Sequence, residues 1–163
     1  MIPIDNYSAP SDANPSSAAE EKRLKILIVD DMKTIRTHTR SLLVDGDYQI
    51  EEATDGVEAI EVATTYHPHL VLMDIVMPKM DGITCCRKLK SNPAFKNLKV
   101  IMVTGKGDYK QIAEAFRAGC DDYITKPINQ TELKEKVEDL AKYARARDRL
   151  LPLIGNTPHH RHP

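Results

Sequence analysis

The chain has 163 residues, which is enough for one domain with its own core and short tails. Hydrophobic residues make up 41% and charged residues 29%, a balance typical of globular proteins. The formal net charge is -1, so bulk electrostatics gives no reason to expect direct binding of nucleic acid or of an anionic membrane. No apolar run approaches the roughly 20 residues that span a bilayer, and no Lys or Arg precedes Lys22, which argues against a secretory signal.

The two ends of the chain differ in composition from its middle. Residues 1–22 contain three prolines, several serines and few large apolar residues, so they cannot bury enough surface to offset the entropy of ordering. Residues 151–163 are rich in Pro and His, and the irregular spacing of the histidines favours a solvated end over a metal site. We expect flexible tails over 1–22 and 151–163 and one folded domain over 23–150.

Five short apolar runs follow the first tail, as expected for β-strands. They are residues 25–29, 49–53, 70–73, 100–103 and 122–125. Three of the runs are continuous stretches of Ile, Leu, Val and Met rather than alternating ones. That pattern is typical of parallel strands covered on both faces.

Apolar residues recur with helical spacing after each run, which predicts five helices. The predicted buried positions are Ile35, Leu42 and Leu43; Val57, Ile60 and Ala63; Ile83, Cys86 and Leu89; Ile112, Ala115 and Phe116; and Leu133, Val137 and Leu140. Gly119 stands where a helix C-terminal cap belongs, and Asn129 or Thr131 could cap the last helix. The fivefold alternation of strand and helix predicts an α/β fold, a doubly wound parallel sheet between helices.

Three cysteines are present, and no two have the gap of a redox or zinc motif. Cys85 and Cys86 are adjacent, and Cys120 stands alone. We interpret all three as small apolar residues of a protein in a reducing compartment, and we expect a cytoplasmic location.

Polar residues stand at the ends of the apolar runs. The first run ends in Asp30 and Asp31, the third in Asp74, the fourth in Thr104 and the fifth in Lys126. In an open parallel sheet the functional crevice lies beyond the carboxyl ends of the strands, so these side chains are predicted to converge there.

The predicted cluster carries an excess of negative charge. Its three carboxylates and one ammonium sum to a formal charge of -2. Two carboxylates about 4 Å apart repel by ~4 kcal/mol at an effective dielectric near 20, so the cluster needs a cation. All candidate ligands are oxygens, which favours Mg²⁺ or Mn²⁺ over zinc. Asp74 can then act as a nucleophile towards a phosphoryl group, and Lys126 and Thr104 are suited to hold its other oxygens.

At these residues the sequence resembles the response-regulator receiver family of two-component signalling. The resemblance spans roughly Leu24 to Leu140, and its matching segments are residues 28–31, 72–78, 80–82, 103–105 and 123–127. One pair of adjacent Asp residues would be weak evidence, whereas all five segments in order are specific. The resemblance implies a flavodoxin-like fold with five parallel strands in the order 2-1-3-4-5 and five helices.

The resemblance also assigns the site residues. It makes Asp74 the phosphoacceptor and Lys126 the phosphate-binding residue. It places the metal on Asp30, Asp31, Asp74 and the backbone carbonyl of Val76, with Mg²⁺ or Mn²⁺ as the cofactor.

Further implied features concern the switch. Thr104 and Tyr123 correspond to the family's switch pair, and the peptide bond before Pro127 is expected to be cis. Val76 and Lys106 flank the path of the water that hydrolyses the phosphoaspartate. Because an apolar Val76 offers no side-chain hydrogen bond to orient that water, we expect a long-lived phosphorylated state.

The implied function is that of a stand-alone response regulator rather than an enzyme with a separate substrate. It would accept a phosphoryl group on Asp74 from a sensor histidine kinase or a histidine phosphotransfer protein. Because the sequence leaves no room for an output domain after residue 150, we expect output through protein–protein contacts. The expected contact surface is formed by the fourth helix, the fifth strand and the fifth helix, without direct nucleic-acid or membrane binding.

Other interpretations fit the residues less well. A haloacid-dehalogenase-type phosphatase would have Asp-x-Asp after the first strand, whereas Met32 follows Asp30 and Asp31 here. A non-phosphorylated pseudo-receiver would not need Asp74, Thr104 and Lys126 together. Two carboxylates after the first strand would repel the phosphate of a flavodoxin's cofactor. Four basic residues stand around the end of the last predicted helix: Lys142, Arg145, Arg147 and Arg149. We interpret them as complementing the dipole of that helix rather than as a docking surface for an acidic partner.

Overall fold

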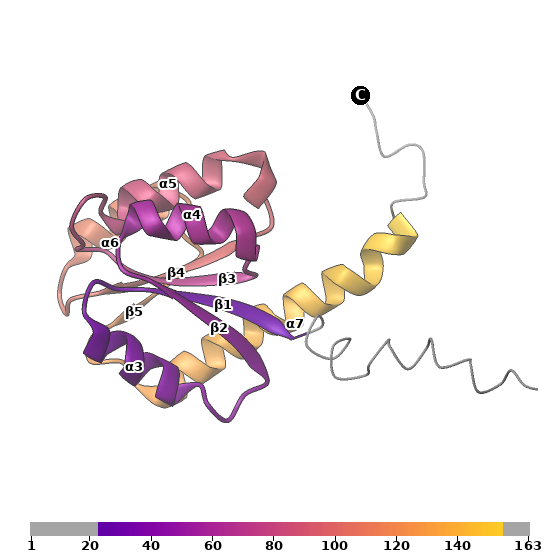
Figure 1. Ribbon diagram of the computed structural model, residues 1–163, viewed down its shortest axis with the longest axis horizontal. Helices are drawn as coiled ribbons and strands as arrows, with labels where there is room; N and C mark the ends of the chain where they lie inside the picture. The colour runs from indigo at the N-terminus through magenta and orange to yellow at the C-terminus, as the bar shows by residue number, and fades with distance from the viewer. Residues whose placement is uncertain (1–22, 155–163) are drawn as a thin grey trace, which may run out of the picture.

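The computed structural model describes residues 23–154, in which five parallel strands form one sheet of order β2-β1-β3-β4-β5 (Figure 1). The strands are β1 (Leu24–Val29), β2 (Tyr48–Ala53), β3 (Leu70–Asp74), β4 (Lys99–Thr104) and β5 (Asp122–Thr125). The α-helices are α3 (Lys33–Leu42), α4 (Gly56–Tyr66), α5 (Gly82–Ser91), α6 (Tyr109–Arg117) and α7 (Gln130–Ile154), and one 3-10 turn, η2, spans Pro93–Phe95. The predicted α/β fold and strand order are confirmed.

The three continuous apolar runs form the middle of the sheet. β1 pairs with β2 and β3, and β4 pairs with β3 and β5, all in parallel. Every residue of β3 is buried. In β4 all residues but the first are buried, and in β1 all but the second. The edge strands β2 and β5 are mostly only partly buried. Coverage on both faces therefore explains the unbroken apolar sequences of β1, β3 and β4.

Helices cover both faces of the sheet, and each face has its own core. On one face α4, α5 and α6 pack through Ala59, Ala63, Cys85, Leu89 and Ala115. On the other face α3 and α7 enclose a second core, to which α7 contributes Leu133, Val137, Ala141 and Ala144. Figure 1 shows this division, with α4 and α5 on the side of the sheet opposite to α3 and α7. The three cysteines are free and buried, as expected.

Two predicted core positions are wrong. Val57 is 42% exposed, because α4 starts at Gly56 and turns Gly56, Ala59 and Ala63 to the core instead. Phe116 is 45% exposed; its ring lies at the border of α6, in edge-to-face contact with the ring of Tyr123 at 6.1 Å. In α4 three small residues form the inner face, and in α6 Ile112 and Ala115 form it, so Val57 and Phe116 lie outside the buried face of their helices.

The expected local signals at helix ends are present. Gly119 follows α6 with φ of 104°, a conformation that suits a residue without a Cβ. The Asn129 side chain accepts a hydrogen bond from the Glu132 N–H at 2.9 Å, so Asn129 caps α7. The Lys126–Pro127 peptide bond is cis.

The last helix is longer than the expected domain. α7 continues to Ile154, four residues beyond the predicted boundary at 150, and in Figure 1 its C-terminal half projects past the sheet. The predicted tail over 1–22 and the remainder of the predicted tail, 155–163, lie outside the described residues, and their flexibility stays a prediction. Within 23–154, no helix combines the length and the apolar character that a membrane crossing requires.

Candidate functional site

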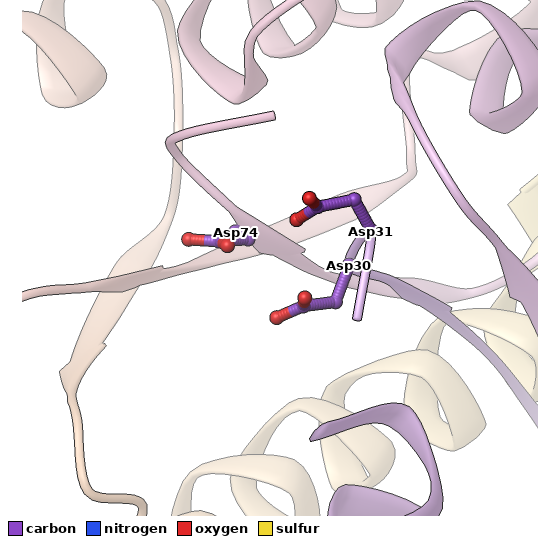
Figure 2. Close-up of side chains that lie close together, drawn as sticks. All are labelled: Asp30, Asp31 and Asp74. Atoms are coloured by element: carbon purple, nitrogen blue, oxygen red, sulfur yellow. The ribbon is translucent and has the colours of Figure 1, made fainter. Parts of the chain in front are cut away.

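Three carboxylates meet at the carboxyl end of the sheet. β1 and β3 are neighbours, with Val29 opposite Met73, so the residues that follow each strand are brought side by side. Asp30, Asp31 and Asp74 each place a carboxylate oxygen within 4.8 Å of the others. Figure 2 shows the two carboxylates of the β1 end beside that of the β3 end. The predicted convergence of these residues is confirmed.

Asp30 is held in place by its own main chain. Its N–H donates to the carbonyl of Ala53 on β2 at 3.2 Å, which extends the strand pairing by one residue. Its Oδ1 accepts the N–H of Met32 at 2.9 Å, and the residue is 3% exposed. Asp31, in contrast, is exposed. The turn between β1 and α3 therefore presents one fixed, buried carboxylate and one that is open to solvent.

Lys126 supplies a positive charge close to the acidic cluster. Its ammonium lies 3.2 Å from Asp74 Oδ2 and 3.5 Å from Asp30 Oδ2. The main-chain N–H of Lys126 donates to the Thr104 carbonyl at 2.8 Å, which joins the end of β5 to the end of β4. The predicted approach of Lys126 to the carboxylates is thus present, and its single ammonium is shared between two of them.

The pKa of Asp74 reflects its burial and the charges around it. Burial raises the pKa of Asp74 above its ordinary value. The Lys126 ammonium acts in the opposite direction, the Asp30 carboxylate adds to the rise, and the Val76 N–H stabilises the anion. The Lys126 ammonium therefore does not fully offset the effect of burial on the Asp74 carboxylate.

The donor set fits a hard divalent cation. It consists of carboxylate oxygens from Asp30, Asp31 and Asp74, and no nitrogen or sulfur ligand joins them within 23–154. Three carboxylates and one ammonium leave a formal charge of -2, which a divalent ion would cancel. Oxygen-only ligands in small number match Mg²⁺, which keeps several of its waters.

Thr104 ends β4 beside the cluster and lacks a partner of its own. It is 1% exposed, and among the described residues its hydroxyl has no hydrogen-bond partner. A buried hydroxyl without a partner is costly, so one that persists suggests a ligand that is not bound here.

Tyr123 lies further along the sheet edge, on β5. Its ring touches Phe116 of α6 edge-on, and the ammonium of Lys136 from α7 lies 5.3 Å from its centre. Lys136 also donates to the Tyr123 carbonyl at 2.7 Å. The ring is partly buried, and these contacts place it between α6 and α7.

The loop after Asp74 runs close to the site. Val76 is 68% exposed, and its main-chain N–H stabilises the Asp74 carboxylate. The Gly82 N–H donates to the Ile75 carbonyl at 2.8 Å, and a Cβ on Gly82 would lie 2.2 Å from the Asp74 carbonyl oxygen. Only glycine fits at this position, because the helix start must approach the strand end closely.

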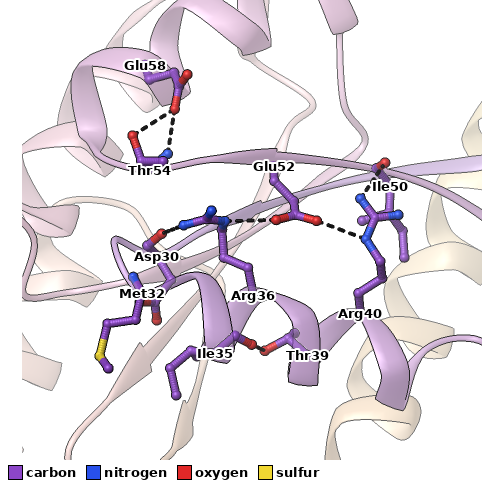
Figure 3. A network of polar contacts seen from close by, with 10 residues as sticks. All are labelled: Asp30, Met32, Ile35, Arg36, Thr39, Arg40, Ile50, Glu52, Thr54 and Glu58. Atoms are coloured by element: carbon purple, nitrogen blue, oxygen red, sulfur yellow. Dashed lines mark hydrogen bonds and ion pairs between the residues drawn. The ribbon is translucent and has the colours of Figure 1, made fainter.

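Sequence reasoning missed a polar network behind Asp30. Arg36 of α3 reaches the Asp30 carbonyl and the Glu52 carboxylate, and Arg40 reaches Glu52 from the next turn (Figure 3). The available signal was the i, i+4 spacing of two arginines on α3, together with an acidic residue on the strand that follows it.

Comparisons with known proteins agree with this geometry. The family model of the response regulator receiver domain matches residues 26–138. The chain is 37% identical over 110 residues to Protein PilG of Pseudomonas aeruginosa, covering 68% of this chain and 82% of that protein. It is 39% identical over 120 residues to the transcriptional regulatory protein ResD of Bacillus subtilis, covering 74% of this chain. The chain spans only about half of ResD, 49% of its length.

Solved structures give the same result. A response regulator receiver domain protein (CheY-like) from Methanospirillum hungatei superposes with a TM-score of 0.70 at 30% identity, covering 77% of this chain and 98% of that chain. The receiver domain of a signal transduction histidine kinase from Syntrophus aciditrophicus gives a TM-score of 0.68 at 35% identity, with 72% and 89% covered. The chain belongs to the response regulator receiver domain family of two-component signalling.

Proposed function

We propose that Asp74 accepts a phosphoryl group in a Mg²⁺-dependent reaction, and that the chain works as a phosphorylation-controlled response regulator. The observation that carries the proposal is the buried Asp74 carboxylate, which lies among two other carboxylates and 3.2 Å from the Lys126 ammonium. The phosphodonor would be a phosphohistidine of a sensor kinase or of a phosphotransfer protein. As the Asp74 oxygen bonds to phosphorus, the N–P bond of the donor breaks.

Each neighbouring residue has a part in this proposal. Asp30, Asp31, Asp74 and the main-chain carbonyl of Val76 would hold the cation. When bound, Mg²⁺ supplies charge neutralisation and polarises a phosphoryl oxygen. The Lys126 ammonium, already beside Asp74, can move onto another phosphoryl oxygen. The unpartnered Thr104 hydroxyl can donate to a third.

The direct test is a measurement of intact mass after incubation with a small acyl phosphate, with Mg²⁺ or with a chelator. The parent should gain one phosphoryl group only with Mg²⁺, and Asp74→Asn should gain none. Asp81→Asn is a matched control, because Asp81 is an exposed carboxylate in the same loop whose capping role Asn can fulfil. An adduct that persists in Asp74→Asn, or that forms equally well in chelator, would contradict the assignment.

The docking of the phosphodonor is supported by a pocket beside Lys126. This mainly apolar pocket of about 370 Å³ is lined by Ile35, His38, Lys126, Pro127 and Ile128. It lies between α3 and the loop after β5, next to the ammonium that faces Asp74. A helix of the donor that fills this pocket would bring a phosphohistidine to the acceptor. Such a donor draws its phosphate from ATP, so the proposed location is the cytoplasm.

The conformational change on phosphorylation would pass from Thr104 to Tyr123. If the Thr104 hydroxyl moves towards a phosphoryl oxygen, it vacates volume that the partly buried Tyr123 ring can enter. That movement would separate Tyr123 from Phe116 and Lys136, and so reshape the surface of α6, β5 and α7. We propose that a protein target, rather than nucleic acid or a membrane, reads this surface.

The test of this output is Thr104→Ala. The variant should still accept phosphate, but amide NMR shifts around Tyr123 on phosphorylation should become smaller than in the parent. Full-sized shifts in Thr104→Ala would contradict the coupling between the two residues.

The lifetime of the phosphorylated state is proposed to depend on Val76. Its apolar side chain, two residues after Asp74 and 68% exposed, offers no hydrogen bond to orient an attacking water. Val76→Asn or Val76→Gln should therefore speed loss of the phosphoryl group, measured by intact mass over time. An unchanged or slower loss would mean that this side chain does not limit water attack.

A further inference from the structure

Arg36 lies behind the acidic site, and the proposed chemistry makes no use of it. Its Nη1 donates to the main-chain oxygen of Asp30 at 2.8 Å, and its Nε donates to Glu52 Oε1 at 2.8 Å (Figure 3). The Arg36 side chain is 12% exposed. We propose that Arg36 is a positioning residue that, anchored by Glu52, fixes Asp30 for binding of the divalent cation. This inference rests on the proposed function, because the cation site is part of it.

The main chain at Asp30 shows why such support is needed. Strand β1 ends at Val29, and the Asp30 N–H is the last to pair with β2, through the Ala53 carbonyl. The Asp30 carbonyl lies beyond this ladder, where the chain turns into α3. Arg36 provides the donor that a neighbouring strand would otherwise supply. Since the Met32 N–H holds Asp30 Oδ1 from the other side of the turn, the direction of the Asp30 carboxylate depends on how this turn is fixed.

Glu52 in turn fixes Arg36. Its Oε2 accepts from Arg40 Nε at 2.9 Å, and Arg40 reaches the Ile50 carbonyl at 3.3 Å. Burial acts to raise the pKa of Glu52, but hydrogen bonds from Arg36 and Arg40 outweigh it and hold that pKa below its ordinary value. The charged carboxylate thus stands between two guanidinium groups, as Figure 3 shows.

The geometry of the guanidinium matters for this role. Arg36 donates from two different nitrogens to two acceptors that belong to different elements, Asp30 after β1 and Glu52 on β2. A lysine at this position carries the same charge on one nitrogen at the end of a flexible chain, and does not reproduce a fixed fork. Arg36→Lys should therefore keep the charge and lose the positioning.

Electrostatics and positioning predict opposite signs when the arginine is removed. Arg36 is a cation near a proposed cation site, so Coulomb repulsion alone would make Mg²⁺ bind more tightly to Arg36→Met. A positioning role predicts weaker binding, because Asp30 loses its fixed direction. Arg40→Met removes the same charge and a bond to the same Glu52, but Arg40 makes no hydrogen bond to Asp30. Arg40 is therefore the matched control.

The experiment is a calorimetric Mg²⁺ titration of the full chain and these variants, well below their melting temperatures. Arg36→Met should raise the Kd about tenfold, as expected for a residue that orients a metal ligand, and Arg36→Lys should raise it in the same direction. Arg40→Met should bind as the parent does or slightly more tightly. If Arg36→Met and Arg36→Lys bind Mg²⁺ as tightly as the parent, the positioning role is wrong.

A second readout separates positioning from general loss of structure. In the metal-free protein, Arg36→Lys should shift the amide signals of residues 30–32, whereas signals of the distant α5 should stay in place. In phosphorylation assays the Mg²⁺ concentration for half-maximal rate should rise, while the rate at saturating Mg²⁺ stays close to that of the parent. A lower rate at saturation with an unchanged half-maximal concentration would overturn the proposal.

The two proposals fail in distinguishable ways. If the parent binds no Mg²⁺ in the titration, the cation site itself is wrong, and the role of Arg36 falls with it. If the parent binds Mg²⁺ and is phosphorylated on Asp74, but neither Arg36 variant changes the Kd, only the role of Arg36 is wrong.

Discussion

The two ends of the sheet differ in how their charges are paired. At the amino end, Asp121 accepts from the Lys90 ammonium at 2.8 Å and from the Val100 N–H at 2.9 Å, and the Lys99 ammonium lies 3.8 Å away. At the carboxyl end, three carboxylates lie together, and the ammonium of Lys126 is within ion-pair distance of two of them, Asp30 and Asp74.

This difference separates scaffold from site. The negative charge of Asp121 is balanced by two ammonium groups and a main-chain N–H, and its contacts join α5, β4 and the start of β5. Three carboxylates with one ammonium, beside the unpartnered hydroxyl of Thr104, form an arrangement that remains incomplete without a ligand.

The sharpest test of this difference replaces one carboxylate at the amino end of the sheet and, in a separate variant, one at the carboxyl end. Asp121→Ala should lower the free energy of unfolding by ~2 kcal/mol, because the Val100 N–H loses its acceptor and the Lys90 ammonium keeps only the Leu98 carbonyl. Asp30→Asn should leave it unchanged or raise it by about 1 kcal/mol in Mg²⁺-free buffer, because it relieves repulsion while Asn can still accept the Met32 N–H. Urea unfolding at neutral pH measures both. Equal losses in the two variants would show that the ends do not differ in this way.

A cation should remove much of the difference between the ends. If Mg²⁺ binds only the folded chain, a concentration of ten times the Kd adds about 1.4 kcal/mol of stability. We therefore expect the parent to melt at a higher temperature with Mg²⁺ than with a chelator, by differential scanning calorimetry. Asp30→Asn and Asp74→Asn should show a smaller rise. A rise of the same size in both variants would indicate that the ion acts elsewhere on the chain.

The sequence was sufficient to predict which side chains meet at the candidate site, because each of them stands where an apolar run stops. The runs that became β1, β3 and β4 end abruptly in Asp30, Asp74 and Thr104, and a parallel sheet brings such ends to one edge. The predicted strands match the observed ones to within one residue at each end.

What the sequence did not reveal depends on contacts between elements. The bond from Arg36 to the Asp30 carbonyl needs the turn after β1 to fold α3 back over its own strand, and the bond to Glu52 needs β2 to lie beside β1. Helical periodicity likewise could not decide that Val57 and Phe116 lie off the buried face, since other residues of the same helices took the inner positions. The extension of α7 to Ile154 was not predicted, because the Pro- and His-rich composition of residues 151–163 indicated a tail.

Two buried threonines, one at the carboxyl end of the sheet and one inside α3, differ in whether their hydroxyl has a hydrogen-bond partner. Thr104 is 1% exposed with no partner among the described residues, whereas Thr39 is 3% exposed and donates to the Ile35 carbonyl at 2.9 Å. Thr104→Val should leave the free energy of unfolding unchanged or raise it slightly, and Thr39→Val should lower it by about 1 kcal/mol. Urea unfolding in Mg²⁺-free buffer would show this. A loss at Thr104 as large as that at Thr39 would mean that the Thr104 hydroxyl is paired in solution.

The smallest expected effect concerns pH and the Glu52 network. Because the pKa of Glu52 is lower in the folded protein than its ordinary value of 4.5, its ion pairs stabilise the fold fully above that pH and less as the pH falls through the folded value. The parent should therefore be more stable than Glu52→Gln by less than about 1 kcal/mol at pH 6 to 7, and this advantage should shrink on acidification below about pH 4.5. The exposed pair of Arg23 and Asp47 provides a control, since its carboxylate is 75% exposed and Asp47→Asn should make little difference at any pH. Urea unfolding of the three proteins at matched pH values gives the comparison. If the advantage over Glu52→Gln grew as the pH fell, Glu52 would be taking up its proton more readily in the folded state, and the two arginines would not be holding it as a carboxylate.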